Sequence, residues 1–152
     1  MTSDFCVAVH ALVFLHHKGC SQSSEEMAAN ICTHPARVRK VMARLKRAGL
    51  VSTKEGADGG YLFSGDPRQI SLQQVARALE ARCVSSAWRS GDTDMDCLIA
   101  SGMAAVMDEL FADLDSRCME RLGEIALSDL EARLFSAGTR PCGKKREAGR
   151  RE

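Results

Sequence analysis

Residues 33–49 read THPARVRKVMARLKRAG, and this run contains the clearest helix of the chain. Pro35 suits the first turn of a helix, and Gly49 is the residue type that commonly ends one. Apolar residues recur three and four positions apart, as on the buried face of an amphipathic helix, at Val38, Val41, Met42 and Leu45. The opposite face carries six bases and no acid, namely Arg37, Arg39, Lys40, Arg44, Lys46 and Arg47. The run therefore predicts a helix with one buried face and one strongly basic face.

Two further helices are predicted before this run. Residues 3–18 have helical apolar spacing and end at Gly19, and Ser23 or Ser24 is placed to cap a second helix over residues 25–31. Only the turn at residues 32–33 separates this second helix from the basic one. Two helices joined by so short a turn, the second of them basic, are typical of a helix-turn-helix.

A hairpin and a further helix are predicted after the basic run. Residues 50–65 read LVSTKEGADGGYLFSG, in which two short β-favouring runs flank a glycine-rich turn, the pattern of a wing. Ser71 and Gln74 match a capping box that opens a helix over residues 72–80, which closes the core. Residues 1–80 are therefore predicted to form a winged helix-turn-helix domain.

The second part of the chain has a different organisation. Residues 81–95 lack a clear period and are predicted to be a linking loop, followed by a long helix from Asp96 to Leu122. Ser128 is predicted to cap a last short helix within the region 96–135, and residues 136–152 have the composition of a disordered basic tail. The expected fold is mainly α (α+β), a winged helix followed by a long helix. The apolar stripe of that helix is predicted to be buried against a partner, through Ile99, Met103, Val106, Leu110 and Leu114.

Composition limits the classes of protein that the chain can represent. With 152 residues, 45% apolar and 27% charged, it suits one globular domain with an added arm. No stretch approaches the ~18–20 apolar residues of a membrane span, and the start lacks the features of a secretory signal, so a cytoplasmic protein without membrane contact is expected. The formal net charge of +1 conceals a polarised chain, because residues 80–135 carry twelve acids against five bases.

The basic helix and the hairpin together predict a surface for double-stranded DNA. The start of a helix in the major groove reaches base edges, whereas bases further along it and on the wing reach phosphates. The glycines of the wing would let its backbone approach a phosphate or a narrow minor groove. The alternative is that these bases only form a solvent-exposed helix face and bind no DNA. The predicted DNA-contacting residues are Thr33, His34, Ala36, Arg37, Arg39, Lys40, Arg44, Lys54, Asp58, Gly59 and Gly60.

Residues 33–80 resemble the signature of the Rrf2 family of winged-helix regulators. The resemblance rests on the basic helix ending in Leu-Lys-Arg-Ala-Gly-Leu-Val, the Gly-Gly-Tyr wing, the Asp-Pro before Ile70, and the helix ending in Ala-Leu-Glu at residue 80. It implies a homodimer held by the long helix that usually represses genes by binding a pseudo-palindromic operator. The resemblance thus implies a dimerisation helix whose interface is the apolar stripe on residues 99–114, and the helical spacing of that stripe agrees with the role.

The cysteine pattern departs from that of the cluster-binding members of the family. Those members carry three closely spaced cysteines in the loop before the dimerisation helix, whereas this chain has Cys83 and Cys97 there and Cys118 well along the helix. No cofactor is therefore predicted. An iron–sulfur cluster with a ligand from elsewhere stays an alternative that the spacing does not favour.

The seven cysteines also suggest a thiol switch. The number is odd and no pair has CxxC spacing, so reduced thiols are expected. Cys97 lies at the start of the long helix, whose dipole lowers a thiol pKa, but Asp94 and Asp96 beside it oppose that effect. Cys83 and Cys97 could meet, or pair across a dimer, on oxidation. The alternative is that both are buried or idle thiols.

These observations predict a DNA-binding transcription regulator, expected to be a repressor controlled by a redox or small-molecule signal, with the effector not identified. An enzyme is not expected, since no nucleophile and base or metal triad has a recognisable spacing. Two alternatives remain open. One is an iron–sulfur or metal sensor of the same family, and the other is a protein-interaction module that has lost DNA binding and docks a partner on its acidic helix.

Overall fold

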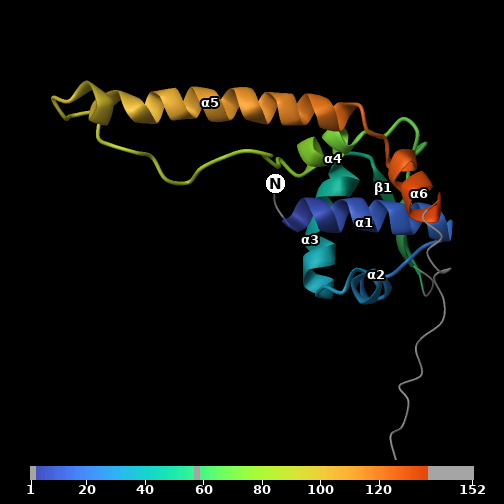
Figure 1. The fold of residues 1–152 in the computed structure, drawn as a ribbon. Helices are drawn as coiled ribbons and strands as arrows, with labels where there is room; N and C mark the ends of the chain where they lie inside the picture. The colour runs from blue at the N-terminus through green and yellow to red at the C-terminus, as the bar shows by residue number, and fades with distance from the viewer. Residues whose placement is uncertain (1–2, 57–58, 137–152) are drawn as a thin grey trace, which may run out of the picture.

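The computed structural model describes residues 3–56 and 59–136. Their helices and strands confirm a mainly helical winged-helix fold with one long C-terminal helix (Figure 1). In chain order they are α1 (Ser3–Lys18), α2 (Ser24–Ile31), α3 (Pro35–Arg47), β1 (Val51–Lys54), β2 (Gly60–Phe63), α4 (Leu72–Ala78), α5 (Leu98–Gly123) and α6 (Leu127–Ser136). The tail predicted over 136–152 lies outside the described residues beyond Ser136.

The core is built around α1, because the other helices of the winged-helix unit bury their apolar faces against it (Figure 1). Ala8 and Ala11 are completely buried, and their small side chains let neighbouring helices approach α1 closely. The predicted apolar face of α3 is buried in full, with each side chain at most 1% exposed: Val38, Val41, Met42 and Leu45. The basic face of α3 is consequently directed away from the core.

Two capping boxes set where helices begin. Ser23, and not Ser24, is the N-cap of α2, where it exchanges hydrogen bonds with Glu26. Ser71 and Gln74 form the predicted box at the start of α4. In each case the N-cap side chain accepts a hydrogen bond from a backbone N–H that the helix itself leaves unpaired.

The wing is a two-stranded antiparallel hairpin fixed at its base to the turn before α2. β1 and β2 pair Val51 with Phe63 and Thr53 with Tyr61. Tyr61 also exchanges two backbone hydrogen bonds with Gln22, of 2.9 and 3.0 Å. Gln22 of the α1–α2 turn thus pairs with β2 as an isolated β-bridge. This pairing holds the wing against the helix-turn-helix.

The last two helices differ from the prediction at their starts. α5 begins at Leu98 after Cys97 as N-cap, two residues later than the predicted start at Asp96. The predicted cap at Ser128 is wrong, because α6 already begins at Leu127, which is buried in the core. At this helix start Asp129 Oδ2 accepts the Ala126 N–H at 2.9 Å, as the third helical residue does in a capping box.

α6 packs on α1 and not along α5. His16 Nδ1 lies 2.6 Å from Glu131 Oε1 and Leu127 joins the core, so the chain returns to the winged-helix unit after α5. The sequence predicts one region over residues 96–135. It does not predict that α6 returns to the winged-helix unit.

α5 extends far beyond the rest of the molecule, and the linking segment runs outward below it to the start of the helix (Figure 1). None of its residues is buried within the chain. Every side chain of the predicted stripe is exposed: Ile99 71%, Met103 39%, Val106 60%, Leu110 47% and Leu114 39%. None of the helices that the structure describes is both long and apolar enough to cross a membrane.

Candidate nucleic-acid interface

A tight turn presents the first residues of α3 on the surface. Cys32 ends α2 with a left-handed φ of 58°, which reverses the chain within three residues. His34 is the exposed N-cap of α3 and Pro35 follows it in the first turn. Thr33 is half-buried and Ala36 is exposed, so the predicted base-contacting end of the helix is accessible.

Two of the predicted DNA-contacting arginines are held by acids from other helices. Arg37 Nε lies 2.8 Å from Asp4 Oδ1 on α1, and its guanidinium also donates to the Ser3 hydroxyl. Arg39 Nη1 lies 3.0 Å from Glu25 Oε1 on α2. The basic run lacks acids in sequence, but the fold brings these two carboxylates to it.

Further bases of α3 are held by neutral groups. Arg44 Nη1 donates to the Leu79 carbonyl at the end of α4 at 2.9 Å, and Arg44 is half-buried. Lys46 Nζ donates to Thr53 Oγ1 on β1 at 2.8 Å, which links α3 to the wing. These hydrogen bonds orient both side chains. Because the acceptors are neutral, they do not compensate the positive charges.

Three cations on this face have no hydrogen-bond or ion-pair partner among the residues that the structure describes. They are exposed and come from α3 and β1: Lys40, Arg47 and Lys54. Of these, Lys40 and Lys54 belong to the predicted DNA-contacting set. Because no acid offsets them, they are the groups on this face best placed to attract a phosphate.

The wing glycines have packing reasons of their own. A Cβ at Gly60 would lie 2.5 Å from the Gln22 carbonyl oxygen, and a Cβ at Gly59 would lie 2.7 Å from the Gly56 oxygen. Both glycines thus permit close backbone contacts within the protein, whether or not they approach DNA. Asp58, also predicted to contact DNA, lies outside the described residues.

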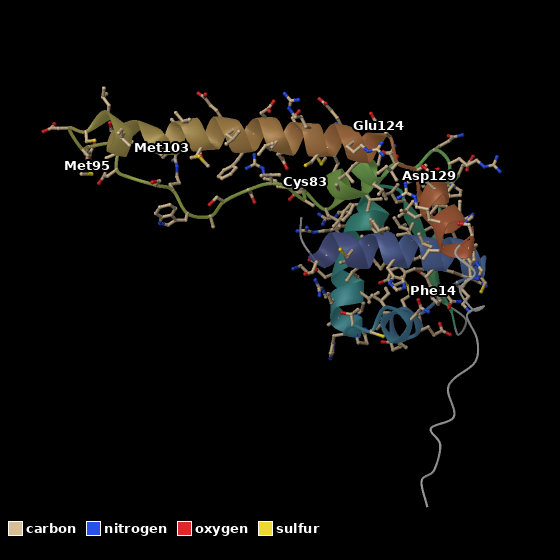
Figure 2. All side chains as sticks on the ribbon, in the orientation of Figure 1. Phe14, Cys83, Met95, Met103, Glu124 and Asp129 are labelled. Atoms are coloured by element: carbon tan, nitrogen blue, oxygen red, sulfur yellow. The ribbon has the colours of Figure 1, made fainter. Side chains whose placement is uncertain are left out.

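The structure separates, within one chain, the two cysteines that could meet on oxidation. Cys97 is the exposed N-cap of α5, and backbone N–H groups of Ala100 and Ile99 lower its thiol pKa. Cys83 instead lies beside the other end of α5, with its Sγ 3.8 Å from Met119 Sδ. At 1.5 Å of rise per residue, about 30 Å of helix separates them. Figure 2 shows Cys83 far from Met95, which precedes Cys97.

This arrangement does not fit an iron–sulfur cluster held by one chain. Cluster ligands must surround a single centre, but Cys83 and Cys97 lie at opposite ends of α5. Within residues 3–56 and 59–136, no three side chains of His, Cys, Asp or Glu are grouped as a metal site requires.

Comparison with known proteins agrees with the fold. The model of the Rrf2 family, described as iron-dependent transcriptional regulator, matches residues 1–133. A Bacillus subtilis (strain 168) protein named as an HTH-type transcriptional regulator, YwnA, is 28% identical over 137 residues, which are 89% of this chain and 99% of YwnA.

Solved structures show the same fold. A transcriptional regulator from Lactobacillus plantarum superposes with a TM-score of 0.80 at 24% identity, covering 91% of this chain and 93% of its own. The IscR structure from T. potens gives a TM-score of 0.68 at 20% identity, covering 92% and 91% of the two chains.

Proposed function

The chain belongs to the Rrf2 family of transcriptional regulators, and from this premise we propose that it is a cytoplasmic repressor that binds a pseudo-palindromic operator as a homodimer. It is a DNA-binding regulator and not an enzyme. The observation that carries the proposal is a pair of cations on α3 and β1, Lys40 and Lys54, which have no side-chain partner within residues 3–56 and 59–136 and lie beside an accessible helix start. They lie where phosphate contacts are needed when α3 enters a major groove.

In the proposed complex, the start of α3 reads bases and the surrounding cations bind phosphates. Arg37 and Arg39 approach DNA with their guanidinium groups oriented by Asp4 and Glu25. A phosphate or a guanine edge then replaces one of these acid contacts, because ion pairs at the protein surface are weak. Arg44 and Lys54 bind the backbone, and the tip of the wing, including Asp58, lies along the adjacent groove.

The homodimer is supported by the exposed stripe on α5. The end of α5 packs on the core through the half-buried Met119 and Leu122, whereas the stripe before it stays exposed, so a partner is needed to stabilise that part of the helix. A second copy supplies an identical stripe, and an isologous contact between two α5 helices creates a two-fold axis. Two recognition helices related by that axis require two half-sites about one DNA turn apart.

We assign the control of DNA binding to a redox signal acting on the linking segment or on α5. A small rotation at the dimer axis changes the distance between the two α3 helices and hence the fit to both half-sites. The cysteines of this region, Cys83 among them, are the groups that such a signal would oxidise.

The decisive experiment starts with a duplex selected from a random library for binding to the reduced protein. Lys40→Ala is expected to weaken binding to this duplex and to lower the slope of log affinity against log salt by about 1, because one phosphate contact is lost. Arg133→Ala is the matched control. It also removes one positive charge from an exposed side chain, but on α6, which packs on α1.

The alternatives give different results. Equal losses for Lys40→Ala and Arg133→Ala would mean that α3 is not the recognition surface. Failure to select any duplex would favour the protein-interaction module. A coloured protein after anaerobic purification would favour an iron–sulfur sensor, with ligands that one chain does not bring together.

A further inference from the structure

The linking segment is fastened to α5 where it leaves the winged-helix unit. Asp115 Oδ1 accepts the backbone N–H groups of Cys83 at 2.6 Å and of Val84 at 3.0 Å. Its other carboxylate oxygen lies 3.9 Å from Arg82 Nε. This clamp places the Cys83 side chain over the turn of α5 that follows Asp115 (Figure 2).

The same turn of α5 carries a second thiol. Cys118 and Met119 follow Asp115 at three and four residues, so all three side chains share one face of the helix. Cys83 Sγ lies 3.8 Å from Met119 Sδ, and its thiol interacts with that of Cys118. Burial, then the neighbouring Cys118 and Asp115, raise the pKa of the Cys83 thiol. The fold therefore brings together two cysteines that are 35 positions apart in the sequence.

We propose that Cys83 and Cys118 are an oxidisable pair that forms a reversible disulfide within one chain, and that this bond lowers the affinity of the protein for its operator. The disulfide itself does not depend on the proposed function. Its effect on operator binding rests on that function.

A hydroperoxide is the oxidant class that the geometry suits. Cys118 is exposed and reacts first, as the thiolate attacks the peroxide, takes one oxygen to become a sulfenic acid, and releases an alcohol or water. The half-buried Cys83 thiol then attacks the Cys118 sulfur, the S–S bond forms, and water leaves with the Cys83 proton. Each sulfur gives up one electron and the peroxide takes both.

A chain of contacts connects this pair to the DNA-facing surface. Arg44 of α3 donates to the Leu79 carbonyl, and Leu79 and Ala81 are buried just before the clamp at Cys83. Residues 79–84 are thus held at one end by α3 and at the other by α5. Formation of an S–S bond of about 2.05 Å moves Cys83 towards α5. Because residues 79–84 are held at both ends, this movement displaces the Leu79 carbonyl that orients Arg44. The recognition helix and the dimer helix are both affected.

The chemical part is tested by peptide mapping of the full chain. The reduced protein is treated with hydrogen peroxide, its remaining thiols are alkylated, and it is digested with trypsin without reduction. Trypsin cuts after Arg82, Arg89, Arg117 and Arg121, so the expected product is CVSSAWR joined to CMER. Cys97→Ser should keep this product, and Cys118→Ser should lose it. Peptides joined through Cys97, or two alkylated cysteines at 83 and 118, would overturn the proposal.

The regulatory part uses the selected duplex. Oxidation is expected to weaken binding by the wild-type protein on the order of tenfold, within the usual range of coupling between two sites. Cys118→Ser should bind as the reduced wild type does before and after peroxide, and Cys97→Ser should respond as the wild type does. A disulfide that leaves the affinity unchanged would overturn the control. A reduced protein that binds no duplex would instead overturn the proposed function and leave the thiol pair standing.

Discussion

Single side chains on α3 show how the fold sets what each base can do. Arg37 and Asp4 form an ion pair of 2.7 Å with side chains 35% and 27% exposed, so the pair contributes little to stability. The ion pair instead orients the Arg37 guanidinium. A guanidinium held by one carboxylate has fewer conformations to lose when it binds DNA. Lys40 has no such contact among the described residues and acts through its charge alone.

Gly60 is the residue at which a single methyl group should disturb the wing. Gly60→Ala places a Cβ 2.5 Å from the Gln22 carbonyl oxygen, so backbone must shift. We expect a loss of about 1–3 kcal/mol in the free energy of unfolding, measured by urea denaturation. Gly123→Ala is the control, since its Cβ would meet Gln73 at an ordinary 3.5 Å. Equal stability of both variants would contradict the role of the Gln22 contact.

Asp115 predicts a pH dependence of stability. The N–H group of Val84, followed by that of Cys83 and by Arg82, lowers its pKa below the usual 3.8 against the effect of desolvation. The charged carboxylate therefore stabilises the folded state fully above about 3.8, and this contribution is lost as the pH falls through the lower folded value.

Asp115→Asn should consequently be less stable than the wild type at neutral pH, and the difference should shrink as the pH falls below 3.8. Urea denaturation at a series of pH values measures both curves. A difference that stays constant over the whole series would show that the charge of Asp115 is not what fastens the linking segment.

At the scale of elements, the start of α4 is where the winged-helix unit meets the end of α5. Ser71 and Gln74 form the capping box, while the Leu72 N–H donates to the Ile125 carbonyl at 2.9 Å. Leu127 donates in turn to the Ile70 carbonyl at 3.0 Å. One turn of α4 thus supports the α5–α6 junction.

Ser71→Ala should lower the free energy of unfolding by about 1 kcal/mol, because the Gln74 N–H loses its partner. Ser71→Asn keeps an N-cap oxygen and should recover most of that loss, which separates capping from packing. Thermal unfolding followed by circular dichroism measures both variants. An alanine variant as stable as the wild type would mean that the box contributes nothing at this helix.

The helices were predictable because the signals that specify them lie close together in the chain. Ser71 and Gln74, Pro35, and the apolar spacing of Val38 and Val41 act within one or two turns of chain, so the sequence contains them directly. The start of α6 was mispredicted because Leu127 is drawn into a core formed by α1 and α4. Burial by distant elements outweighed the local preference for a serine cap.

At the scale of the whole molecule, α5 is the part of the described chain whose apolar surface lacks a partner. Leu110→Glu should convert the proposed dimer into a monomer of 16.5 kDa, because two buried charges would face each other across the two-fold axis. Light scattering coupled to gel filtration measures the mass. Ala105→Glu is the control, as it adds the same charge to exposed α5 off the stripe. A wild-type protein that is itself monomeric would contradict the dimer.

The helices, the hairpin and the family resemblance follow from the sequence alone, because periodicity, caps and turn residues act over a few positions of the chain. Three features arise only when the chain folds: which charges on α3 lack a partner among the described residues, the return of α6 to α1, and the approach of Cys83 to Cys118 rather than to Cys97. Asp4 and Arg37 are 33 positions apart and Cys83 and Cys118 are 35 apart. No local rule links such residues, since their contact exists only once the helices between them have packed.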